Sequence, residues 1–153
     1  MATKPFRLKT VQRLREADRD EARGRLAEAY RALEKLADQQ ATVSGEVADA
    51  LRSQRNAFEK AQPDLNLAIE AQRFLAVLRA QQSTMEKQSG LLQAEIEKRR
   101  AALAEADRNV RLLEKLEEKH DAAVALEQNR AENAQLDEAA GLRHRRFGEE
   151  GSR

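Results

Sequence analysis

The stretch "VRLLEKLEEKHDAAVALE", residues 110–127, contains the side chains of this chain that are best placed to do chemistry. Glu117 precedes His120 by three positions, and this spacing puts both side chains on one face of a helix. The same spacing holds metal ions in di-metal carboxylate bundles, where facing helices supply further Glu and His ligands. The chain has only two histidines and no cysteine, which is too few ligands for such a site. We therefore expect a solvated helix face, with no metal and no cofactor.

Enzymatic chemistry is also poorly supported elsewhere in the chain. Glu117 and Glu127 would lie about 15 Å apart along a helix, too far for a catalytic carboxylate pair. The sequence contains no glycine-rich phosphate loop and no nucleophile elbow. The pattern predicts a non-enzymatic protein.

The composition favours long helices. Charged residues make up 36% of the chain, aromatic residues make up 3%, and tryptophan is absent. The 28 basic and 27 acidic side chains leave a net charge of +1, so we expect no nucleic-acid partner. The opening "MATKPFRLKT" is not a signal peptide, and no apolar run is long enough for a membrane span. These features predict a cytoplasmic protein.

The two prolines, Pro5 and Pro63, set the expected layout, because an interior proline breaks a helix. We expect a first helix over about 6–61, a turn over about 62–66 and a second helix over about 67–146. Residues 147–153 would form a tail, and residues 1–153 a single coiled-coil domain.

Apolar residues recur at heptad spacing in both expected helices. In the second, a seam starts at Leu75 and Leu78 and runs through six heptads to Val110 and Leu113. The first carries a looser stripe whose drift suggests a stutter; its members are Val11, Leu14, Leu26, Leu33, Leu36, Val43, Val47, Leu51 and Phe58. Neither stripe can be buried alone. The predicted fold is therefore all-α, a long two-helix antiparallel coiled-coil hairpin with unequal arms.

The second helix should extend beyond the first. If facing residues sum to about 127, Phe6 lies opposite Asp121, and the second helix continues after about 121 as an overhang. Glu117 and His120 interrupt the seam where the first helix ends. Val124, Ala131 and Leu136 leave a weak apolar stripe on the overhang. This stripe is either a partner-binding surface or part of a solvated helix end.

Several charged and aromatic residues have two interpretations. Arg7 and Arg13 belong to a basic N-terminal arm, and Arg143 and Arg145 lie near the end of the second helix. Cations at a helix C-terminus complement the helix dipole, but they also suit contact with an acidic partner. Phe74 flanks the seam and is either a contact anchor or a cover for the coiled-coil core.

Four segments carry a family resemblance: "FRLKTVQRLREADRDEARGRLAEA", "AQRFLAVLRA", "EIEKRRAALAEADRNVRLLEKLEEKH" and "EQNRAENAQLDEAAGLR". In this order, over nearly the whole chain, they resemble the flagellar FliJ family. The resemblance implies a two-helix stalk, similar to the stalk subunit of rotary ATPases, in the flagellar type III export apparatus. It also implies that the terminal end enters the export ATPase hexamer, that the stalk contacts the export gate protein FlhA, and that it escorts export chaperones.

The resemblance also implies candidate contacts. In the family's gate-contacting order Phe, Leu, Ala, His, this chain matches with Phe74 and Leu78, whereas Gln81 and Met85 replace the last two. For the ATPase ring the candidates are Arg7, Arg13, Val124, Ala131, Leu136, Arg143 and Arg145. The protein would be monomeric alone and would reach the cytoplasmic face of the inner membrane only through its partners. A stalk of a non-flagellar type III secretion system and a self-associating structural coiled coil remain the alternatives.

Overall fold

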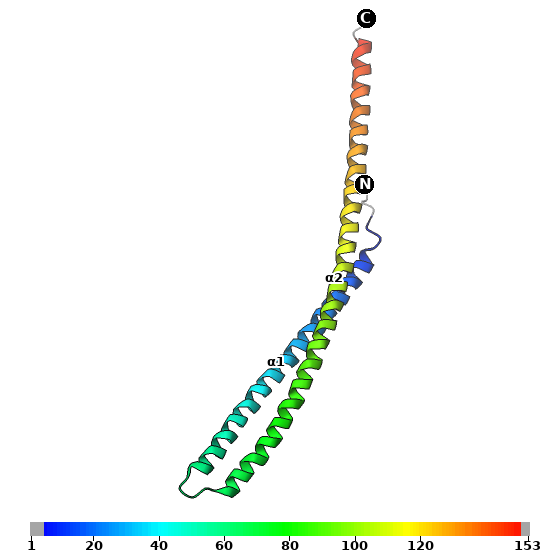
Figure 1. Cartoon of the computed structure of the whole chain (residues 1–153). Coiled ribbons are helices and arrows are strands. Elements are labelled where there is room, and N and C mark those ends of the chain that lie inside the picture. Colours follow the sequence, from blue (N-terminus) through cyan, green and yellow to red (C-terminus); the bar gives the residue numbers. More distant parts are fainter. Residues whose placement is uncertain (1–4, 151–153) are drawn as a thin grey trace. The chain divides into compact units, whose positions relative to one another are not determined.

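The computed structural model describes the backbone of residues 5–150 and the side chains of residues 5–143. Helix α1 spans Lys9–Glu59, 51 residues, and helix α2 spans Leu65–Glu150, 86 residues (Figure 1). The chain divides into two compact units, one of residues 18–105 and one of residues 1–17 with 106–153. In each unit a segment of α1 packs against a segment of α2. The predicted all-α hairpin with unequal arms is confirmed.

The connection between the helices is built around Pro63 and Asp64. The Asp64 amide donates to the Ala57 carbonyl at 3.0 Å, and its carboxylate accepts a hydrogen bond from the Leu67 amide at 3.1 Å. Asp64 therefore caps the N-terminus of α2, which begins at Leu65, two residues before the predicted start. Pro63 disfavours helical geometry in the preceding residue, so α1 ends before it.

The outer ends of the helices also differ from the expected bounds. Helix α1 begins at Lys9 rather than near residue 6, after a turn in which the Lys9 amide donates to the Phe6 carbonyl at 3.2 Å. Helix α2 continues through Glu150, past the expected end near 146, because no proline follows to stop it. Of the predicted tail, residues 151–153 lie outside the described residues.

In the unit of residues 18–105, the α2 seam is the predicted one. Leu75, Leu78 and Ile96 are only 4%, 2% and 4% exposed. Leu75 and Leu78 form a cluster with Val43 and Ala50 of α1. This register fixes which flanking residues face solvent.

The predicted α1 seam is wrong near the connection. Leu51 and Phe58 are 36% and 54% exposed, whereas Ala50 and Ala57 are buried. From Ala29 to Ala57 the buried and half-buried positions alternate by three and four residues without a break, so there is no stutter in this segment. The prediction followed side-chain size, but the helical phase determines which residues lie between the helices.

The other unit pairs residues 9–17 of α1 with the following heptads of α2. Val110 and Leu113 are buried there as predicted, but their buried neighbour in α1 is Gln12. Val11 and Leu14, placed in the seam by the sequence, are 40% and 59% exposed. Gln12 occupies the seam position in this unit, and its side chain hydrogen-bonds to Glu117 of α2.

Candidate partner-binding surfaces

Glu117 lies in a polar layer between the two helices. Its Oε1 atom lies 2.7 Å from the amino group of Lys9, and it also accepts a hydrogen bond from the Gln12 side chain. The hydrogen bond from Lys9, followed by that from Gln12, lowers the pKa of the Glu117 carboxyl. The remaining amide oxygen of Gln12 is buried without a hydrogen-bond partner among the described residues. The seam is therefore continued here by polar side chains.

His120 completes this layer one turn further along α2. Its ring centroid lies 5.6 Å from that of Phe6, and its Nδ1 lies 3.2 Å from a carboxylate oxygen of Asp121. The side chains of Glu117 and His120 are only 25% and 29% exposed. The expected solvated face is only partly solvated, because Phe6 and Lys9 lie against these two residues. Within residues 5–143, no group of three potential ligands could hold a metal ion.

Contacts within each unit give the register of the antiparallel pairing. Lys9 pairs with Glu117, and the residue numbers sum to 126. In the other unit the Gln82 amide lies 3.5 Å from the Ser44 hydroxyl, which gives the same sum. Both are one below the predicted value. Phe6 accordingly contacts His120 rather than facing Asp121.

Beyond Asp121, α2 continues as a helix with mostly exposed side chains. Val124 and Ala131 are half-buried, whereas Leu136 is 67% exposed. Residues 122–142 hold four acids and one base, a local charge of −3; the charged residues are Glu127, Arg130, Glu132, Asp137 and Glu138. The apolar stripe of the overhang is therefore bordered by acidic side chains.

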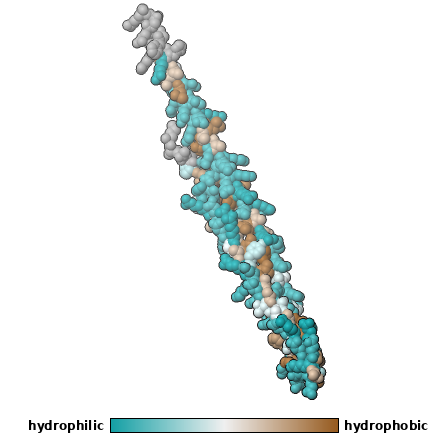
Figure 2. Space-filling model, turned by 90° about the vertical axis from the view of Figure 1, so that its left-hand side faces the viewer, coloured by the Kyte–Doolittle hydropathy of each residue, from teal (hydrophilic) through white to brown (hydrophobic). Residues whose placement is uncertain are grey.

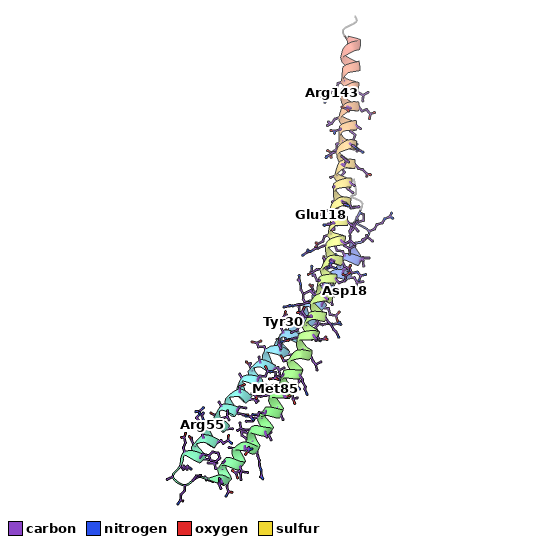
Figure 3. All side chains as sticks on the ribbon, viewed as in Figure 1. Asp18, Tyr30, Arg55, Met85, Glu118 and Arg143 are labelled. Carbon is purple, nitrogen blue, oxygen red and sulfur yellow. The ribbon has the colours of Figure 1, made fainter. Side chains whose placement is uncertain are left out.

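The candidate cations flank this acidic segment. Arg7 and Arg13 are exposed at the beginning of the chain, and Arg143 is exposed near the end of the described side chains (Figure 3). The side chain of Arg145 lies outside the described residues. Basic and acidic groups thus alternate within this unit, so its charge does not form a single basic patch.

The candidate gate contacts divide into two groups. Phe74 is 51% exposed and Gln81 is exposed, seven residues apart on one flank of the seam. Leu78 is only 2% exposed, and Met85 packs against the core cluster. The buried pair supports the surface and does not form it. Val77 was not among the predicted contacts, but it is 62% exposed on the same flank, because the heptad register places it beside Phe74.

Polar contacts join the helices on both flanks of the seam in the unit of residues 18–105. Arg99 occupies a seam position and donates to the Arg25 carbonyl and to Glu95, which lowers the pKa of the Glu95 carboxyl. On the flank opposite Phe74, the Arg100 guanidinium donates to the Tyr30 hydroxyl and lies 5.6 Å from the centre of that ring. This contact fixes which side chains share that flank.

A model of the flagellar FliJ protein family matches residues 3–149. The chain belongs to the flagellar FliJ family. No curated protein and no solved structure matches it. FliJ-family membership makes the chain a non-enzymatic structural component of the flagellar export apparatus. The family match includes the α2 overhang as well as the helical pairing, and it favours the flagellar apparatus over a non-flagellar secretion system.

The surface of this FliJ-family chain is largely charged. Figure 2 shows hydrophilic side chains over most of the visible face, with apolar side chains between them. Among the described residues, neither helix contains a segment long and apolar enough to cross a membrane. The candidate contacts with partner proteins are therefore the exposed apolar residues on the flanks of the seam and on the overhang.

Proposed function

We propose that this FliJ-family protein is a stalk that couples the export ATPase ring to the export gate on the cytoplasmic side of the inner membrane. The observation that carries the proposal is the continuation of α2 beyond Asp121, where exposed Leu126 and Leu136 have no covering side chain from the described part of α1. An isolated helix of this length is marginally stable in water, so a partner that binds the overhang would also stabilise it.

The overhang and the N-terminal arm are the proposed contacts with the ATPase ring. Apolar contact would come from Val124, Ala131 and Leu136, and Arg7, Arg13, Arg143 and Arg145 would bind acidic groups of the ring. The acids between these apolar residues require basic groups on the opposing surface. A ring lining with both signs of charge suits the segment better than a purely acidic one.

The flank with Phe74 is the proposed contact with the export gate. Phe74, Val77 and Gln81 would touch the gate, while Leu78 and Met85 keep α2 in register behind them. Escort of export chaperones belongs to the same proposal, and the exposed leucines of the overhang are the candidate contacts for it. The protein would then be monomeric in the absence of these partners.

Truncation tests the ATPase contact. A chain ending at Asp121 should lose binding to the purified export ATPase but keep the cooperative unfolding of the paired helices in circular dichroism. A chain ending at Glu150 is the matched control and should bind as the full chain does. Undiminished ATPase binding by the shorter chain would refute the proposed role of the overhang.

Self-association is the second candidate function, favoured by the same exposed leucines. Two overhangs could pair through Leu126 and Leu136 and bury both stripes. Light scattering separates the candidates: a concentration-dependent dimer that the Asp121 truncation abolishes supports self-pairing. A monomer over a wide concentration range supports the stalk.

A further inference from the structure

The paired helices of residues 18–105 have two flanks, and contacts across the seam show which side chains share each flank. Tyr30 directly follows the buried Ala29, and Arg100 directly follows the seam residue Arg99. The hydrogen bond between Tyr30 and Arg100 places the residues that follow these seam positions on one flank, here called the Tyr30 flank. Phe74 precedes the seam residue Leu75 and lies on the opposite flank.

Near the connection the Tyr30 flank carries a strip of exposed apolar side chains. Leu51 and Phe58 occupy the heptad position of Tyr30, and Leu65 occupies that of Arg100. Ile69 lies one helical turn after Leu65. Their exposed fractions are 36%, 54%, 63% and 48% in chain order, so the strip is not part of the core.

The charges that border this apolar strip are mostly positive. The heptad positions of this flank and the adjoining outer face, between Ala48 and Ala80, hold three arginines and one acid that border the strip; these residues are Arg55, Arg73, Arg79 and Glu59. Arg52 is not one of them, because its side chain forms an ion pair with Asp49 of the opposite flank at 2.8 Å. Figure 3 marks Arg55 on α1 near the connection. The opposite flank of the same segment holds two bases, Arg52 and Lys60, and two acids, Asp49 and Glu70, so its charges cancel.

The form and charge of the strip decide between possible occupants. A second copy binding through the same flank would bring like-charged arginines together, since a two-fold interface pairs each patch with itself. A groove of about 460 Å³ beside the connection opens on the Phe74 flank, and it is polar and carries both signs of charge; its lining residues are Asp49, Arg52, Ser53, Asn56, Lys60 and Leu67. The Tyr30 flank offers an apolar strip bordered by cations, which is the pattern of helices that lie in a membrane interface.

We propose that the Tyr30 flank near the connection binds an anionic phospholipid surface directly. Phe58 and Leu65 enter between the headgroups, and the arginines contact the lipid phosphates. The proposal goes beyond the stalk function and does not depend on it, because it requires neither the overhang nor an ATPase. It replaces the expectation that the protein reaches the membrane only through its partners.

Vesicle co-sedimentation of the full chain tests the proposal. Vesicles of phosphatidylglycerol and phosphatidylcholine in equal parts should sediment the protein, and vesicles of phosphatidylcholine alone should not. The double substitution Phe58→Ser with Leu65→Ser should abolish sedimentation. The matched control, Phe74→Ser with Val77→Ser, changes two equally exposed residues on the opposite flank and should sediment like the unsubstituted chain.

The arginines provide an independent measurement. Arg55→Gln and Arg73→Gln should each weaken binding about fivefold, and added salt should weaken it further. Circular dichroism should show that all variants remain helical, since each changed side chain is exposed. Absence of sedimentation with the anionic vesicles would overturn the proposal and favour an acidic protein surface as the occupant. Equal loss in both double variants would also overturn it.

Discussion

The amino group of Lys9 lies 2.7 Å from Oε1 of Glu117, which joins the first turn of α1 to a residue 108 positions later. Both groups are near the surface, so the ion pair is screened by solvent and contributes mainly through its geometry. A shift of one heptad would separate Lys9 from Glu117 and leave the buried Gln12 opposite a different residue. The polar layer thus favours a single alignment of the two helices.

The protonation of Glu117 should affect the stability of this layer. Because the folded-state pKa of Glu117 is lowered, its contribution is present above the unfolded-state pKa and is lost as the pH falls through the folded-state pKa. Lys9→Met should raise the pKa of Glu117, since the Lys9 hydrogen bond is the largest cause of the shift. Carbon-13 NMR titration of the Glu117 carboxyl measures this. If Lys9→Met shifts this pKa no more than the control Lys119→Met, the pair has been misassigned.

Gln12→Leu should make the paired helices more stable but less specific in their alignment. Removing a buried amide oxygen that lacks a partner favours the folded state by about 1 kcal/mol, and leucine suits the seam. The midpoint of thermal unfolding should rise, while the neighbouring exposed substitution Arg13→Leu should leave it nearly unchanged. A lower midpoint for Gln12→Leu would show that its hydrogen bond to Glu117 outweighs the cost of burial.

Replacing Val77 or Leu78, two adjacent residues of α2, by alanine should affect the stability of the protein very differently. Leu78→Ala should destabilise the protein by about 2 to 5 kcal/mol because it leaves a cavity in the core cluster. Val77→Ala, at a 62% exposed position, should change the stability by less than about 0.5 kcal/mol. Chemical denaturation measures both. Similar values for the two variants would contradict the register of α2.

Glycine substitutions within the helices should stabilise the protein. A Cβ atom added at Gly45 or Gly90 would meet nothing within 4 Å, so no close packing explains either glycine. Gly45→Ala and Gly90→Ala should each raise the free energy of unfolding by about 1 kcal/mol. Gly141→Ala, also in open space but on the overhang, should increase helicity without moving the cooperative midpoint. A loss of stability in the first two variants would indicate that these glycines are needed for bending.

The α2 seam could be predicted because its large apolar residues coincide with the heptad phase. Leu75, Leu78 and Val110 are large apolar residues and are among the most buried residues of the helix. In α1 the large apolar residues are not the buried ones, since Ala57 is fully buried and the adjacent Phe58 is half exposed. Sequence reasoning ranked residues by size, whereas burial follows the angular position around the helix.

The exposure of the candidate contacts also follows the heptad phase. Leu78 was predicted to lie in the seam and is buried, and Phe74 was predicted to flank the seam and is half exposed. The contact of Phe6 with His120 was predicted to within one residue, because counting from Pro63 requires only an antiparallel register. The hydrogen bond from Gln12 to Glu117 could not be predicted, because it depends on side-chain conformations and the heptad pattern gives only the positions of residues around the helix.

The buried residues next to the connection are small: Ala50, Ala57, Ala68 and Ala71. Small side chains bury little apolar area, so packing between the helices contributes less to the free energy of folding here than around Leu75 and Leu78. Local opening should therefore start at the connection, limited mainly by the Asp64 cap. Amide protons in the last turns of α1 should consequently exchange with deuterium before those beside Val43, giving the hairpin a gradient of protection along its length.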